Sequence, residues 1–101
     1  MESIIKDMLE EERNRNLEML RIFQAEIAEL PRGSLVVQSI NGHDYCYLKY
    51  REGDRIVSKY AGKATDCREK LEKAIARRRQ LEQSLRRINY ELKLIQKAVG
   101  T

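Results

Sequence analysis

Hydrophobic positions in the last third of the chain follow the three-four spacing of an α-helix. One side of that helix carries, in order, Leu71, Ala74, Arg78, Leu81, Leu85, Ile88, Leu92, Ile95 and Val99. Only Arg78 in this series is not apolar. A continuous stripe of this kind lies along one side of a helix and packs against another helix. The pattern therefore predicts a long helix over residues 66–99.

A second, less regular stripe predicts a helix over residues 1–30. Its apolar positions are Ile5, Leu9, Leu20, Phe23, Ile27 and Leu30. Ser3 can cap its start, and Pro31 ends it, because a proline disfavours helical geometry in the residue before it. The polar stretch from Glu12 to Asn16 interrupts the stripe, so we expect those side chains to face water.

The termini of the later helix also carry signals. Asp66 followed by Glu69 fits a capping-box-like start after Gly62, and Gly100 suits a C-terminal stop. The first thirty residues carry eight acidic and four basic side chains, whereas residues 68–101 carry four acidic and ten basic ones. Opposite charge favours pairing of the two helices as an antiparallel coiled coil.

Between the helices, residues 33–62 change to the pattern of a three-stranded sheet. Apolar and aromatic runs cover residues 35–40, 45–50 and 55–60, with a second turn around Gly53. Asn41-Gly42 between the first two runs is typical of a two-residue hairpin loop. Such a loop sets Val37 opposite Cys46 and Leu35 opposite Leu48, which predicts an antiparallel meander.

That register divides the sheet into two faces. The predicted core face carries Leu35, Val37, Cys46, Leu48, Tyr50 and Val57. The other face carries Val36, Gln38, Ile40, His43, Tyr45, Tyr47, Lys49, Arg51, Ile56, Ser58 and Tyr60. Helices need not cover this second face.

The size and composition of the chain limit what can be expected of its domain number, oligomeric state and location. With 101 residues, the chain is expected to be a single domain over 1–101 with a small core, for which self-association as a homodimer would bury more surface. Two cysteines form no disulfide framework of the secreted type, and neither a signal peptide nor a membrane span is apparent. We expect a cytoplasmic protein.

The second sheet face is the most function-like feature, because tyrosines alternate there with cations. Aromatic rings stack on bases and cations hold phosphates, although tyrosines are also ordinary strand formers. Arginines of the later helix could extend the surface or simply form a solvated face. The candidate binding residues are Tyr45, Tyr47, Lys49, Arg51, Tyr60, Arg77, Arg79, Arg86 and Arg87.

Catalytic and metal chemistry have little support. His43 beside Asp44 follows a hairpin turn and has no nucleophile or second acid near it in sequence. His43, Cys46 and Cys67 are residue types that bind zinc, but the paired Cys-x-x-Cys spacing is missing and His43 and Cys46 fall on opposite faces. We therefore expect no catalytic residues, no bound metal and no cofactor, and a small metalloprotein is the least favoured class.

The central motifs resemble those of a known set of proteins. Gly33-Ser34-Leu35, the tyrosine-rich strand, Tyr50-Arg51-Glu52-Gly53 and Ser58-Lys59-Tyr60-Ala61-Gly62-Lys63 are similar to motifs of small uncharacterised bacterial and mobile-element proteins, which place them between two long charged helices. That resemblance implies no activity. A shorter similarity, over residues 45–60, is to the three-stranded arm-binding domains of phage integrases, which insert a Tyr- and Arg-rich strand into a DNA groove.

Together these observations predict an α+β protein built as helix, three-stranded antiparallel meander, helix. The leading hypothesis is a non-enzymatic protein that recognises nucleic acid, or a protein that handles nucleic acid, through the Tyr/Lys/Arg face. The alternative is a protein-only interaction module, such as a mobile-element inhibitor or adaptor, that acts through its coiled-coil surface.

Overall fold

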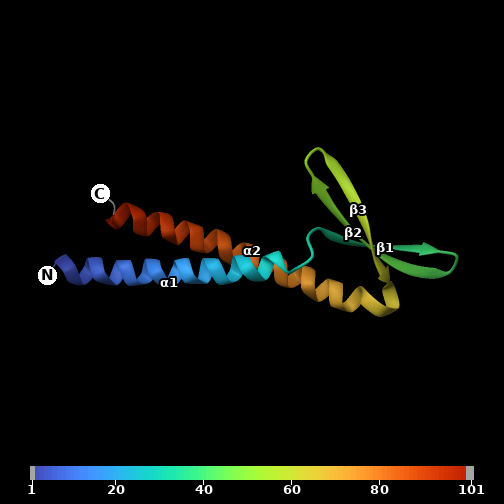
Figure 1. Cartoon of the computed structure of the whole chain (residues 1–101), viewed down its shortest axis with the longest axis horizontal. Helices are drawn as coiled ribbons and strands as arrows, with labels where there is room; N and C mark the ends of the chain where they lie inside the picture. Colours follow the sequence, from blue (N-terminus) through green and yellow to red (C-terminus); the bar gives the residue numbers. More distant parts are fainter. Residues whose placement is uncertain (1, 100–101) are drawn as a thin grey trace. The chain divides into compact units, whose positions relative to one another are not determined.

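The computed structural model describes residues 2–99 and confirms the predicted α+β class (Figure 1). Its elements follow in the order α1 (Glu2–Ala28), β1 (Ser34–Ile40), β2 (His43–Glu52), β3 (Arg55–Lys63) and α2 (Ala64–Val99). The chain divides into two compact units. The helical unit joins α1 to the part of α2 that begins at Gln80, and the sheet unit is Leu30–Arg79.

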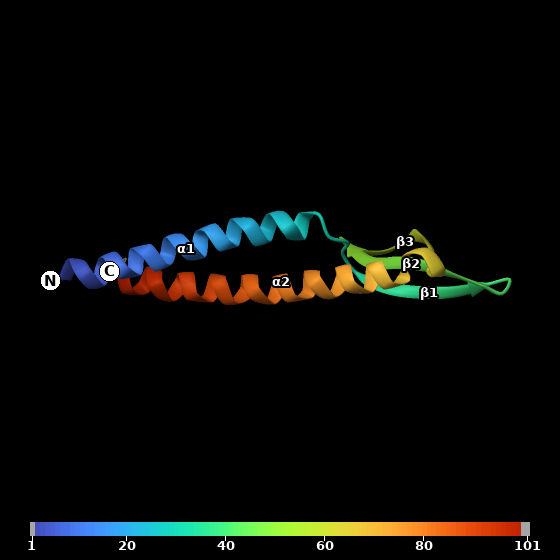
Figure 2. The same cartoon turned by 90° about the horizontal axis from the view of Figure 1, so that it is seen from below.

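In the helical unit, α1 and the C-terminal part of α2 lie side by side and run antiparallel (Figure 2). The predicted stripe of α2 is its least exposed side, with Leu81, Ile88 and Ile95 buried. The start of α1 and the end of α2 meet around an apolar hollow, to which Leu9 and Val99 contribute.

The polar interruption in α1 departs from the prediction. Asn16 was expected to face water, but it is only 3% exposed. Its Nδ2 donates a hydrogen bond to the carbonyl oxygen of Glu12 one turn earlier, at 3.1 Å, so the amide is partly satisfied within its own helix. By contrast, Ile5, assigned to the apolar stripe, is 68% exposed. The apolar stripe of α1 is therefore less regular than that of α2.

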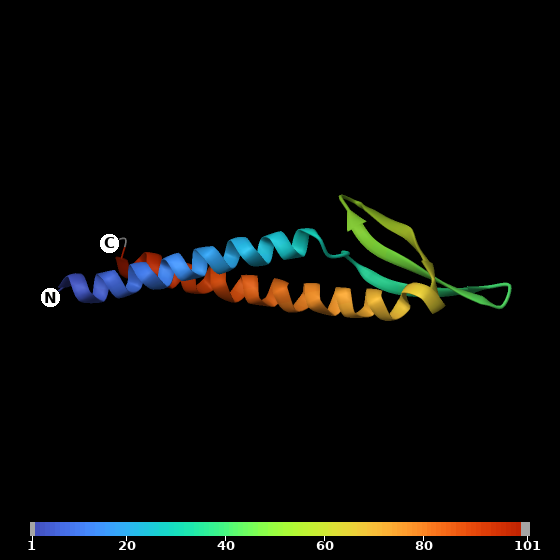
Figure 3. The same ribbon diagram turned by 60° about the horizontal axis from the view of Figure 1, so that its bottom comes forward.

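The sheet has the order β1-β2-β3 and is antiparallel throughout (Figure 3). Val37 pairs with Cys46 and Leu35 with Leu48, as predicted. Asn41 and Gly42 both have positive φ, at 52° and 80°, which is the geometry of the tight hairpin loop that this dipeptide favours. The predicted register of the first hairpin is confirmed.

The residues before β1 explain how the chain enters the sheet. The helix α1 ends two residues before the predicted Leu30, and the N–H of Glu29 closes its last turn on the carbonyl of Glu26. Gly33 then adopts a φ of 98° close to β2, where a Cβ would stand 2.3 Å from the carbonyl oxygen of Lys49. Only glycine fits this approach.

The second helix begins earlier than predicted. It starts at Ala64 rather than at residue 66, so Asp66 lies in its first turn, where its negative charge suits the helix N-terminus. The predicted stop at Gly100 lies outside the described residues. Arg78, the one charged member of the stripe, is half-buried, and its Nη1 donates a hydrogen bond to the carbonyl oxygen of Leu30 at 2.8 Å.

Candidate nucleic-acid interface

The sheet brings three tyrosine rings together on one face. Tyr47 pairs directly with Tyr60 across β2 and β3, and their ring centroids are 5.6 Å apart in an edge-to-face arrangement. Tyr45 lies two residues away on the same face, with its ring 6.2 Å from that of Tyr60. Tyr60 is 55% exposed, while Tyr45 and Tyr47 are half-buried. The rings thus contact one another and remain accessible to solvent.

Cations surround this cluster. Lys49 and Arg51 follow Tyr47 at alternate positions of β2, so they share its face, and both are exposed. Lys63 pairs with Tyr45 and is also exposed. We call the surface formed by these six residues the tyrosine face: Tyr45, Tyr47, Lys49, Arg51, Tyr60 and Lys63.

The sequence pattern did not predict Lys63 as a member of this face, because β3 contains an irregularity. The register shifts between Cys46 and Tyr47, so Gly62, rather than Ala61, pairs with Cys46. This bulge carries Lys63 to a position opposite Tyr45. The available signal was Gly62, because a glycine inside a strand pattern suggests a bulge.

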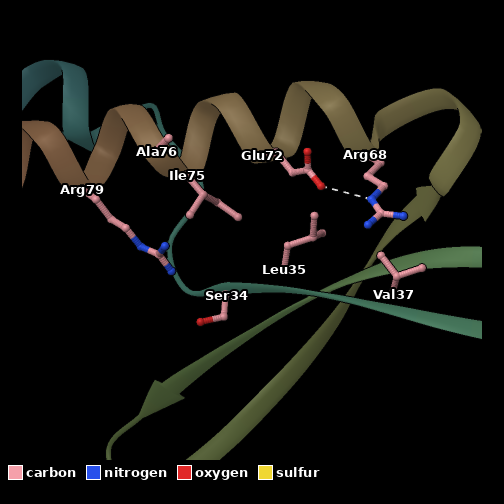
Figure 4. A pocket seen from close by; sticks show the side chains of 8 residues that line it. All are labelled: Ser34, Leu35, Val37, Arg68, Glu72, Ile75, Ala76 and Arg79. Atoms are coloured by element: carbon pink, nitrogen blue, oxygen red, sulfur yellow. Dashed lines mark hydrogen bonds and ion pairs between the residues drawn. The ribbon is translucent and has the colours of Figure 1, made fainter.

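The opposite face of the sheet is partly covered by α2. Leu35 and Val37 of β1 point toward the helix, and Ile75 of α2 points toward them across a groove of about 430 Å³ (Figure 4). Arg68 lies at one end of this groove, where its Nε is 3.1 Å from the Oε1 of Glu72. Because the helix occupies this side, it leaves the tyrosine face open.

The helix arginines are not all part of one surface with the tyrosines. Arg79 lines the groove described above, so it lies over the face opposite the tyrosine face (Figure 4). Arg77 is exposed on the same segment of α2. Arg86 and Arg87 are exposed in the helical unit, and the Nε of Arg87 is 3.7 Å from the Oε1 of Glu91. The sheet therefore gathers only the strand residues of the predicted site.

Another arginine that the sequence did not single out supports the sheet. The guanidinium of Arg32 stacks over the ring of Tyr50, 4.7 Å from its centroid. Its Nη2 also donates a hydrogen bond of 2.6 Å to the carbonyl oxygen of Arg51. This arginine covers the core face of β2 and leaves the side chain of Arg51 on the tyrosine face.

The residues considered for catalysis and metal binding are spread over the first hairpin and the start of α2. The carboxylate of Asp44 accepts a hydrogen bond from the hydroxyl of Ser39, its partner across the hairpin. His43 is exposed near the hairpin turn, whereas Cys46 is completely buried. Within residues 2–99, no three His, Cys, Asp or Glu side chains gather closely enough to hold a metal ion.

The environment of Cys46 affects the pKa of its thiol. Burial raises the pKa of its thiol, and a hydrogen bond with Cys67 raises it further. Folding therefore favours the protonated form of the Cys46 thiol.

Comparisons with known proteins add a family but no activity. Among residues 2–99, neither helix is apolar enough over a sufficient length to cross a membrane. No curated protein and no solved structure matches the chain. Residues 8–73 match a family described as a domain of unknown function, DUF6788. The matched segment runs from α1 through the whole sheet into the start of α2, more than half of the chain. The chain therefore belongs to the DUF6788 family.

Proposed function

We propose that this chain is a non-enzymatic nucleic-acid-binding protein whose contact surface is the tyrosine face. The observation that carries the proposal is the cluster of Tyr45, Tyr47 and Tyr60 with three exposed cations around it. Rings of this kind stack on unpaired bases, and lysine and arginine side chains neutralise the neighbouring phosphates. A single-stranded segment suits the surface best, because only unpaired bases offer their faces to the rings.

The direct test is a titration of labelled single- and double-stranded DNA and RNA with the full chain at several salt concentrations. We expect binding that is strongest for single strands and weakens as salt increases. Each phosphate contact contributes a slope of about −0.7 in log affinity against log salt for single strands. An absence of binding to all four ligands at low salt would contradict the proposal.

Two double variants separate the tyrosine face from general positive charge. Lys49→Ala with Arg51→Ala removes two cations from the tyrosine face, and it should flatten the salt slope by about 0.7 for each phosphate that is no longer neutralised. Arg55→Ala with Lys59→Ala is the matched control, because both residues are exposed on β3 but pair with core-face positions. The control should bind like the wild type. Equally weakened binding in both variants would mean that charge alone, without this face, governs binding.

A protein-only interaction module, such as a mobile-element inhibitor or adaptor, is the second candidate. It is favoured by large apolar side chains that the helical unit leaves exposed: Ile4, Ile5, Met8, Leu17, Met19, Ile22, Tyr90 and Leu94. A second copy of this chain is the partner that best fits them, because α1 is acidic and the last part of α2 is basic. Failure of every nucleic acid to bind, together with self-association, would favour this candidate.

A further inference from the structure

The two cysteines of the chain meet in the sheet unit, although they come from different elements. Cys46 of β2 is completely buried on the core face and pairs with Gly62 of β3. Cys67 lies in the first turns of α2, and its Sγ is 3.3 Å from the position that a Cβ of Gly62 would occupy. A side-chain hydrogen bond also joins the thiols of Cys46 and Cys67. The sulfur of Cys67 therefore lies beside the side chain of Cys46.

Gly62 has no side chain, and this leaves room for the sulfur of Cys67 beside the strand. Gly62 has a φ of 143° and presents only hydrogen to Cys67, so the helix can place its sulfur against the strand. The Sγ of Cys67 also donates a hydrogen bond of 3.1 Å to the carbonyl oxygen of Lys63, which fixes the side chain toward the sheet. Both cysteines are reduced in this structure.

We propose that Cys46 and Cys67 form a redox site, which closes to an intrachain disulfide when it meets a small disulfide such as oxidised glutathione. A metal is a poorer occupant, since no third His, Cys, Asp or Glu completes a ligand set in the described part of the chain. A disulfide needs only the two sulfurs and a short distance between their backbones.

The order of the steps follows from exposure. Cys67 is half-buried and Cys46 is inaccessible, so the thiolate of Cys67 attacks the glutathione disulfide first. One glutathione leaves as a thiolate and takes up the proton lost by Cys67. Cys46 then loses its proton and attacks the sulfur of Cys67, which releases the second glutathione as a thiol. Two protein thiols are oxidised to one disulfide, and one glutathione disulfide is reduced to two thiols.

Formation of the disulfide would link β2 covalently to the start of α2. The bond encloses the segment from Cys46 to Cys67, which contains all of β3. It also anchors β2 between Tyr45 and Tyr47, the two rings that β2 contributes to the tyrosine face. The oxidised protein should therefore unfold at a higher temperature than the reduced protein.

The experiment treats the full chain with oxidised glutathione or with dithiothreitol and measures intact mass, free thiols and the unfolding temperature. The oxidised sample should lose the mass of two hydrogen atoms and both free thiols. A digest without reductant should yield one peptide pair that joins Cys46 to Cys67. The unfolding temperature should rise, and dithiothreitol should reverse all of these changes.

Two variants make the result decisive. Cys67→Ser keeps a donor for the carbonyl of Lys63, and oxidised glutathione should leave its unfolding temperature unchanged. Cys46→Ala should stop at a mixed disulfide on Cys67, since the second thiol is missing. The proposal is overturned if the wild type also stops there, if it forms links only between chains, or if both thiols stay reduced. None of these measurements involves nucleic acid, so the result is independent of the proposed function.

Discussion

The helical unit and the sheet unit use their apolar side chains differently. Leu81, Ile88 and Ile95 repeat along one helix and are buried in the helical unit, whereas Cys46 and Ile75 are the hydrophobic residues buried in the sheet unit. The sheet instead leaves the rings of Tyr45, Tyr47 and Tyr60 half-buried or exposed on one face. Regular burial favours stability, and exposed rings beside cations favour recognition. Substitutions of buried residues in the helical unit should therefore mainly change stability, whereas substitutions on the tyrosine face should mainly change binding.

The largest expected effect is on stability in the helical unit. Leu81 is 2% exposed, so Leu81→Ala should lower the free energy of unfolding by about 2 to 5 kcal/mol, because it removes buried apolar surface and leaves a cavity. Leu85 is half-buried and should cost less. The control is Lys93→Ala, at an exposed polar site of the same helix, whose change should stay below about 1 kcal/mol. Equal urea midpoints for the Leu81 and Lys93 variants would show that the buried stripe of α2 does not stabilise this unit.

The exposed side of the helical unit supplies the next test. We expect a concentration-dependent homodimer, because burying an apolar side chain completely contributes about 1.5 to 3 kcal/mol. Ile22 is 46% exposed, and Ile22→Glu should weaken dimerisation in sedimentation experiments by tenfold or more, about 1.4 kcal/mol. Gln24→Glu adds the same charge to an exposed polar site of α1 and should have little effect. A wild type that stays monomeric at high concentration contradicts the dimer.

An effect of similar size should appear in binding by the sheet unit. Tyr47→Ala should weaken single-strand binding by about 1 to 3 kcal/mol, whereas Tyr47→Phe keeps the ring and should retain most of the affinity. Tyr90→Ala removes an exposed ring from α2 in the helical unit and should leave binding unchanged. If Tyr47→Ala and Tyr90→Ala behave alike, the ring cluster of the sheet is not the contact surface.

The smallest expected effect is a pH dependence that belongs to the sheet unit. Burial, followed by the hydrogen bond with Cys67, raises the pKa of Cys46 above its ordinary value, so folding favours the protonated thiol. The corresponding stability is present below the pKa of the unfolded thiol, about 8.5, and is lost as pH rises through the folded pKa. Urea midpoints measured under reducing conditions should fall more steeply above that pH for the wild type than for Cys46→Ala. If the urea midpoints of the wild type and of Cys46→Ala change with pH in parallel, the raised pKa of Cys46 does not contribute to stability.

Local patterns accounted for most of the fold. Asn41-Gly42 fixed the pairing of Val37 with Cys46, because a two-residue loop allows one register. The spacing of α2 identified Leu81 and Ile88 as buried. These predictions succeeded because turn chemistry and helical periodicity act over a few residues.

The remaining features depend on contacts between distant residues. Asn16 is polar, and nothing near it in sequence indicates that its amide is buried and bonded to its own helix. Ile75 lies outside the predicted stripe and is buried because β1 packs on that side of α2. Of the candidate site, the strand residues were found by alternation, whereas the placement of Arg79 over the opposite face depends on how α2 packs on the sheet.

The bulge opposite Cys46 has a consequence for how the length of β3 can change. Tyr60 and Lys63 share a face although three positions separate them, because Ala61 is an extra residue that the pairing skips. Loss of Ala61 would leave Gly62 opposite Cys46 and Lys63 opposite Tyr45 in an unbroken ladder. A single-residue deletion inside a strand normally turns every following side chain to the other face. Here the strand can shorten by one residue and keep its pattern of exposed rings and cations.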